Sequence, residues 1–138
     1  NVSGGPGTDA VMGDGGDDTC SGGLGNDFFF GGTGNDTYTS DSRLSGGFFT
    51  ENGSDAFDGE GDADVVQLSG DGWTVMVTGV GTLTPGDFVG GSYTQGGATF
   101  GGMVSVMLAG SADPTQDGTH VIQFVNVEEI RLVDGSIK

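Results

Sequence analysis

The most regular pattern of polar and apolar positions lies in residues 4–39, where it repeats every nine residues. Each unit opens with a glycine-rich stretch and carries an aspartate at its sixth position and a larger side chain at its eighth. The aspartates are Asp9, Asp18, Asp27 and Asp36, and the eighth-position residues are Val11, Cys20, Phe29 and Tyr38. The first six positions predict a turn, and the last three predict a short strand whose middle side chain points inward.

A period of nine residues leaves room for one turn and one short strand. Successive strands must therefore alternate between two sheets, and two units make one coil of a flattened solenoid. Coils stack in parallel about 4.8 Å apart, so units two apart become neighbours. This arrangement predicts one row of turns that joins Asp9 to Asp27 and a second row that joins Asp18 to Asp36. Residues 1–3 fit the end of a preceding unit with Val2 in the inward position, so we expect the array to continue before this chain.

The regular pattern breaks at Ser45, where the next aspartate would fall. We divide the chain into the nonapeptide array (1–39), an insertion with a degenerate repeat (40–64), and a C-terminal β-rich region that caps or extends the array (65–138). Residues 40–58 read as a polar insertion, and 59–67 as the degenerate unit that keeps Asp64.

Strand-like patterns fill the C-terminal region, and no segment shows a helical period. We expect strands at 65–68, 73–78, 103–108, 120–127 and 129–133, with a turn at 134–135. The predicted fold class is all-β: a parallel β-roll, which is a two-sheet solenoid of nonapeptide repeats, followed by a non-repetitive β region.

The outward positions of the array differ between odd and even units. Odd units place Ala10, Met12, Phe28 and Phe30 outward, whereas even units place Thr19, Ser21, Thr37 and Thr39 there. An exposed Met-Phe-Phe patch is unfavourable in water, so we expect the odd face to be covered. One candidate cover is the chain itself, through its C-terminal region or through Leu44, Phe48 and Phe49, and the other is a neighbouring subunit.

The composition adds a strong negative charge to this pattern. The chain has 138 residues, 31 of them glycine, and its net charge is −17. Such a chain repels itself and is not expected to bind nucleic acid, and without an apolar run of about 18 residues we expect no membrane insertion. Charge and glycine together favour a disordered linker, but the patterned apolar residues favour a fold in which divalent cations neutralise the carboxylates.

The turns combine the groups that calcium prefers. Ca²⁺ takes about six to eight oxygen ligands from carboxylates and backbone carbonyls, and two neighbouring turns supply them where one cannot. An alternative is that Gly and Asp simply form turns, which the strict nine-residue register disfavours. The expected ligands for several Ca²⁺ ions are Gly4, Pro6, Gly7, Asp9, Gly13, Asp14, Gly15, Gly16, Asp18, Gly22, Leu24, Gly25, Asp27, Gly31, Thr33, Gly34, Asp36 and Asp64.

Three units carry the full Gly-Gly-x-Gly-x-Asp motif, and the second departs from it only at Asp14. The array resembles the RTX, or haemolysin-type calcium-binding, family. The resemblance implies a parallel β-roll in a protein that leaves Gram-negative bacteria by type I secretion and folds when it meets extracellular calcium. Residues 64–70 and 125–135 resemble segments that follow and close such arrays.

No catalytic site is expected. His120 is the only histidine, no Gly-x-Ser-x-Gly motif is present, and Cys20 lies in an inward, apolar position. We therefore expect a secreted or cell-surface, non-enzymatic calcium-binding domain. Two hypotheses for the protein to which it belongs remain open. The first is a surface, adhesive or self-assembling structural protein, with self-association or neighbouring domains as partners. The second is a secretion and folding module appended to a secreted protease, lipase or polysaccharide-modifying enzyme.

Overall fold

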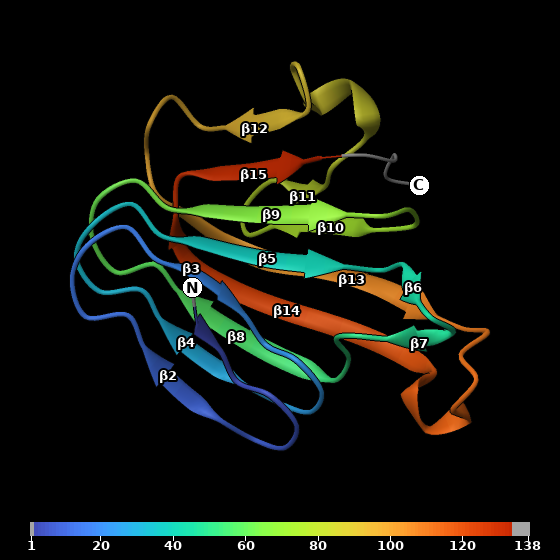
Figure 1. Ribbon diagram of the computed structural model, residues 1–138. Coiled ribbons are helices and arrows are strands. Elements are labelled where there is room, and N and C mark those ends of the chain that lie inside the picture. The colour runs from blue at the N-terminus through green and yellow to red at the C-terminus, as the bar shows by residue number, and fades with distance from the viewer. Residues whose placement is uncertain (1, 134–138) are drawn as a thin grey trace.

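The computed structural model describes residues 2–133 as two facing β-sheets that are joined along the chain by turns (Figure 1). The turn expected at 134–135 lies outside the described residues. The six-stranded sheet comprises, in spatial order, β1 (Val2–Ser3), β3 (Thr19–Ser21), β5 (Thr37–Asp41), β9 (Val65–Ser69), β15 (Glu129–Leu132) and β12 (Ser92–Thr94). The seven-stranded sheet comprises β11 (Gly81–Thr82), β10 (Thr74–Val77), β13 (Phe100–Leu108), β14 (Gly118–Val127), β8 (Ser54–Asp58), β4 (Phe28–Phe30) and β2 (Ala10–Met12).

The predicted all-β class and the parallel β-roll are confirmed. Odd units form β2 and β4 in one sheet, and even units form β3 and β5 in the other. The parallel register pairs Val11 with Phe29 and Cys20 with Tyr38, which are eighth-position residues of units two apart. Two short 3-10 helices, at Pro85–Asp87 and Pro114–Gln116, are the helices of residues 2–133, and no helix there could cross a bilayer.

The roll continues beyond the nonapeptide array. β8 pairs in parallel with β4, and β9 pairs in parallel with β5, so residues 54–69 add a further coil. β14 and β15 then pair in parallel with β8 and β9. The two sheets therefore run without a break from the repeats into the C-terminal strands, and antiparallel strands complete each sheet at the far edge (Figure 1).

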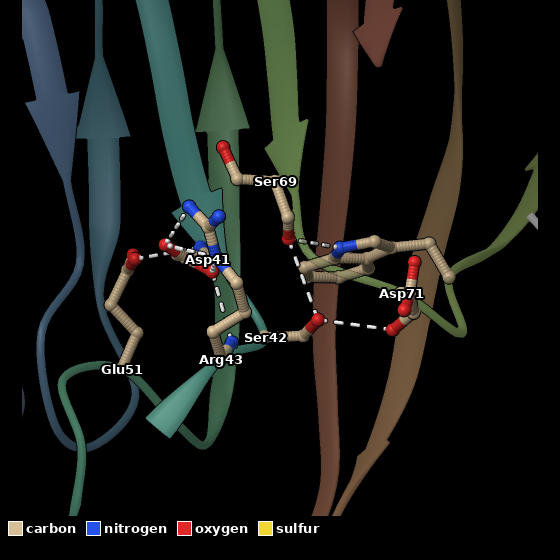
Figure 2. Close-up of polar contacts among 7 residues, drawn as sticks. Asp41, Ser42, Arg43, Glu51, Ser69 and Asp71 are labelled. Atoms are coloured by element: carbon tan, nitrogen blue, oxygen red, sulfur yellow. Dashed lines mark hydrogen bonds and ion pairs between the residues drawn. The ribbon is translucent and has the colours of Figure 1, made fainter. Parts of the chain in front are cut away.

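A short hairpin, β6 (Leu44–Ser45) and β7 (Phe48–Phe49), leaves the roll between β5 and β8. Asp41, at the end of β5, forms an ion pair with Arg43 at 2.8 Å (Figure 2). The backbone N–H of Asp41 donates to the Glu51 carboxylate at 3.1 Å. Ser42 donates to the carbonyl of Asp71 at 3.0 Å. These contacts fix the two ends of the hairpin on the body of the roll.

The core lies between the sheets and is formed by inward side chains of both. Cys20, Phe29, Tyr38 and Phe57 are buried, and Val11 is half-buried against them. The Tyr38 ring packs against Phe29 and Phe57 with ring-centroid distances of 5.4 and 5.6 Å. The predicted role of the eighth position as the source of core residues is confirmed for these units.

The described part of the chain does not cover the odd face, so the first of the two candidate covers is wrong for residues 2–133. Met12, Phe28 and Phe30 are 67%, 49% and 38% exposed, and the C-terminal strands lie beside them in the same sheet rather than over them. The hairpin does not cover them either, since it forms a separate two-stranded sheet in which Leu44 and Phe48 are themselves 43% and 47% exposed. The C-terminal strands add to a sheet instead of forming a third layer because their backbone groups complete its hydrogen-bond ladder.

Candidate metal centre

The glycine-rich turns bring backbone oxygens of neighbouring coils close together. Gly25 and Gly34 adopt φ of 116°, a conformation that L side chains rarely take. A Cβ on Gly25 would also collide with the carbonyl of Gly7, and one on Gly34 with the carbonyl of Gly16. Glycine is therefore required at these positions both for the turn and for the close stacking of coils.

The aspartates stack in two rows, as predicted. In the first row the N–H of Asp9 donates to Oδ1 of Asp27, and the N–H of Asp27 donates to Oδ1 of Asp55, both at 2.9 Å. In the second row the N–H of Asp18 donates to Oδ1 of Asp36 at 2.9 Å, and the N–H of Asp36 donates to Oδ1 of Asp64 at 2.8 Å. Each of these carboxylates thus uses one oxygen to hold the preceding coil.

The second carboxylate oxygen has no partner among the described residues in five of the row aspartates, whereas Asp55 Oδ2 accepts the Tyr38 hydroxyl at 2.9 Å. Oδ2 is buried and without a hydrogen bond in Asp9, Asp18, Asp27, Asp36 and Asp64. A buried carboxylate oxygen without a partner is costly, and one that lies beside others is more so. A repeated set of such atoms fits a row of cations between the turns.

Backbone carbonyls converge on the same oxygens. A Cβ placed on Gly13 would lie 2.5 Å from the carbonyl oxygen of Gly31 and 2.7 Å from Oδ2 of Asp18. A Cβ on Gly31 would meet Oδ2 of Asp36 and lie 2.9 Å from the carbonyl oxygen of Gly59. The space that glycine leaves open is lined by carboxylate and carbonyl oxygen, the donor set of hard Ca²⁺.

Burial sets the electrostatics of the rows when only protein groups are present. Burial, followed by the effect of neighbouring carboxylates, raises the pKa of Asp27 and Asp36, although a backbone N–H bonded to each opposes the shift. The pKa of Asp64 rises to about 7 through burial and the charges of Glu128 and Asp36. A nearby positive charge would stabilise the ionised form of these carboxylates, and Ca²⁺ bound between the turns would supply it.

The other expected ligands occupy the same turns but differ in what they offer. The carbonyls of Leu24 and Thr33 accept backbone bonds from Gly7 and Gly16, both at 2.8 Å. Asp14 takes a φ of 70° where other units have glycine, its side chain is exposed, and its carbonyl accepts from the N–H of Thr33. The remaining members line the same turns, and the ligand role of the whole set stays a prediction: Gly4, Pro6, Gly7, Gly15, Gly16, Gly22, Gly25 and Gly34.

Sequence reasoning missed Asp55 and Glu128 as members of the two rows. Asp55 had a signal, because it lies nine residues before Asp64, as Phe57 lies nine residues before Val66. Glu128 had none, since it accepts the N–H of Asp64 at 2.8 Å across 64 residues.

A buried polar cluster inside the roll does not have the geometry of a catalytic triad. His120 Nε2 lies 3.0 Å from Ser40 Oγ and 3.9 Å from Asp55 Oδ2, while Nδ1 lies 3.1 Å from the carbonyl oxygen of Gly53. A triad places its serine and its carboxylate on opposite ring nitrogens, whereas here both face Nε2. His120 and Ser40 are also closed off from solvent, so the cluster serves to satisfy buried polar groups.

Neither the curated proteins nor the solved structures contain a significant match to this chain. The profile of the RTX calcium-binding nonapeptide repeat does match, in four copies over residues 3–38. Its span coincides with the coils in which Asp9 and Asp18 bond to Asp27 and Asp36. The stacked turns at the start of this chain are therefore RTX calcium-binding repeats.

Proposed function

We propose that this chain is a non-catalytic calcium-binding domain of a secreted bacterial protein, which folds when extracellular Ca²⁺ fills the two rows of turns. The observation that carries the proposal is the repeated pair of carboxylate oxygens: one holds the preceding coil and the other is buried without a partner. Several ions are expected, since each pair of stacked turns repeats the donor set.

The charge balance supports coupling between folding and calcium. A net charge of −17 opposes compaction, and ordering 31 glycines costs backbone entropy. Calcium stabilises the folded state because the unfolded chain lacks the stacked turns. Extracellular calcium modules have dissociation constants of about 10⁻⁴–10⁻³ M, so the domain would stay unfolded in the cytosol and fold outside the cell.

We further propose that the parent protein is a structural or adhesive surface protein. The support is the outer surface of β2, β4, β8 and β14, which we call the apolar face. Phe28, Phe30 and Val125 are exposed there and line one groove with Ala56. Asp58 is the only charged residue among the outward positions of these four described strands. A face so depleted of charge in an acidic protein favours contact with another surface once calcium reduces the repulsion.

The alternative proposal is a folding module attached to a secreted enzyme. It is supported by the burial of His120, whose two ring nitrogens are both occupied by Ser40 and the Gly53 carbonyl. On this proposal the apolar face would contact another domain of the same protein, and the isolated chain would remain monomeric in calcium.

A calcium titration of the purified chain tests both levels of the proposal. Far-UV circular dichroism should report a coil-to-β transition with Ca²⁺ and none with equal Mg²⁺. Light scattering on the same samples should show a rise in mass if the structural proposal is correct, and constant mass if the alternative is. A chain that is fully folded in chelator and binds no calcium would contradict the calcium-coupled function.

A further inference from the structure

The last coil of the roll contains a shortened turn. Between β14 and β15 only Glu128 lies outside a strand, whereas six residues, 59–64, separate β8 from β9. The strands on either side nevertheless keep the register of the roll: Phe124 pairs with Phe57, and Ile130 pairs with Val66. Asn126 absorbs the tighter path with a φ of 55°. The segment is therefore a coil of the roll that is built without the nonapeptide motif.

Glu128 takes the place of the aspartate in this shortened turn. Its Oε1 accepts the N–H of Asp64 at 2.8 Å, the same contact that Asp64 Oδ1 makes with the N–H of Asp36 at 2.8 Å. Glutamate is one methylene longer than aspartate, which lets it reach the row from a shorter turn. The second row thus runs from Asp18 through Asp36 and Asp64 to Glu128.

The carbonyl of Asn126 takes the place of the first glycine carbonyl. A Cβ on Gly59 would lie 2.5 Å from the carbonyl oxygen of Asn126 and would also meet Oδ2 of Asp64. One coil earlier, a Cβ on Gly31 would meet the carbonyl of Gly59 and Oδ2 of Asp36 in the same way. The donor set of the repeats is reproduced by residues that the repeat profile, which ends at residue 38, does not include.

A second observation points to a ligand at this junction. The Asp64 side chain is fully buried, and its Oδ2 has no hydrogen-bond partner among the described residues. The groups beside Asp64 are a carbonyl oxygen and the Glu128 carboxylate, which are acceptors and cannot donate to it. Oxygen atoms that face one another without a donor repel, and a hard cation converts that repulsion into coordination.

We propose that Asp64, Glu128 and the carbonyl of Asn126 form a Ca²⁺ site that ends the second row and ties β14 and β15 to the repeats. The proposal rests on the calcium-coupled folding proposed above and extends it to residues outside the repeat array. Its consequence is that calcium orders the C-terminal strands as well as the nonapeptides, because Asn126 lies in β14 and Glu128 connects β14 to β15.

Three substitutions in the full chain separate a calcium ligand from a simple hydrogen-bond acceptor. Glu128→Gln keeps the length and the acceptor oxygen but removes the charge, and Glu128→Asp keeps the charge but shortens the reach. Glu60→Gln removes the same charge from an exposed residue next to Gly59 and serves as the control. Calcium binding is measured by competition with a chromophoric chelator, and folding by circular dichroism.

If Glu128 is a ligand, Glu128→Gln loses one ion from the binding stoichiometry or weakens that site by about tenfold or more. Glu128→Asp should then fall between the wild type and Glu128→Gln, and Glu60→Gln should match the wild type. If Glu128 only accepts the N–H of Asp64, Glu128→Gln will bind calcium and fold like the wild type. Glu128→Asp, which shortens the reach to that N–H, will then be the less stable of the two variants. That order would overturn the proposal while leaving the function of the repeats intact.

Hydrogen exchange of the wild-type chain gives a readout that does not depend on any variant. Amides of 118–132 should gain protection over the same calcium range as those of 19–38. Protection of 118–132 that does not change with calcium would overturn the site at Glu128. A wild-type chain that binds no calcium would instead overturn the function on which the site rests.

Discussion

The backbone N–H of Asp27 donates to Oδ1 of Asp55 at 2.9 Å although 28 residues separate them. The corresponding bond from Asp9 to Asp27 spans 18 residues. The ten additional residues leave the roll as the hairpin of β6 and β7, and the row of carboxylates continues as if they were absent. The coil geometry, rather than the spacing along the chain, therefore determines which residues face the turns.

We predict that Asp36→Asn weakens calcium binding and removes about 1–3 kcal/mol of the stability measured in saturating calcium. The amide oxygen can still accept the N–H of Asp18, so the loss reports the charge on the second oxygen. In chelator the sign should reverse, because the substitution removes a buried charge. Urea denaturation with and without calcium measures both values, and Asp71→Asn, at an exposed residue, is the control. Equal loss in both conditions would contradict a ligand role.

Gly31→Ala should reduce calcium affinity and destabilise the fold by about 1–3 kcal/mol. Its Cβ would meet Oδ2 of Asp36 and lie 2.9 Å from the carbonyl oxygen of Gly59, in the space where the oxygens converge. Gly61→Ala is the matched control, since its Cβ would lie 3.9 Å from the carbonyl oxygen of Gly32. Thermal melts in calcium compare the two variants, and similar melting temperatures would argue against a cradle at Gly31.

In chelator, lowering the pH from about 7 to 5 should favour the folded state. Burial raises the pKa of Asp55 to about 6 and those of Glu51 and Asp64 to about 7. Groups with a raised folded-state pKa contribute stability that is complete below their unfolded pKa and is lost as the pH rises through the folded value. Burial lowers the pKa of His120, so its protonation opposes the trend, but the carboxylates outnumber it.

Circular dichroism in chelator across this pH range measures the effect. Protons and calcium compete for the same carboxylates, so the apparent calcium affinity should fall over the same interval. A β-signal in chelator that weakens steadily from pH 7 to pH 5 would show that the buried carboxylates do not control the fold.

Replacing both Phe28 and Phe30 with Thr should leave the calcium-induced fold intact and reduce calcium-dependent association. Both side chains point away from the core and are partly exposed, and Thr keeps a high strand propensity. Sedimentation velocity in calcium measures the mass, with Thr37→Ser and Thr39→Ser on the opposite sheet as the control. A double variant that no longer folds would show that the apolar face contributes to the fold itself.

His120→Phe should destabilise the chain by about 1–3 kcal/mol in calcium, because it leaves Ser40 Oγ without its buried partner. The Gly53 carbonyl loses its contact with the imidazole but keeps the N–H of Val121 at 2.9 Å. Adding Ser40→Ala to this variant should cost less than Ser40→Ala alone, since the hydroxyl has already lost its partner. Urea denaturation of the four chains forms a double-mutant cycle. Additive effects would mean that the contact between Ser40 and His120 contributes nothing to stability.

The local pattern was sufficient to predict much of the roll. A glycine-rich turn followed by a three-residue strand permits few ways to stack, so Asp9, Asp18, Asp27 and Asp36 could be placed in their rows from the sequence. The inward side of each strand also followed, because the side-chain period of a strand is two. Phe29 and Tyr38 are accordingly buried.

The continuation of the roll and the exposure of its faces depend on long-range strand pairing. The contact between Glu128 and Asp64 depends on parallel pairing across 64 residues, and no local spacing encodes which distant strand will complete a sheet. The exposure of Phe28 was decided in the same way, because β14 could either cover the odd face or extend its sheet. Extension prevailed since β8 presented unpaired backbone groups, which a parallel strand satisfies. Local spacing along the chain thus specifies the turns, the inward residues and the calcium-binding motif, while pairing between distant strands specifies where the rows of carboxylates end.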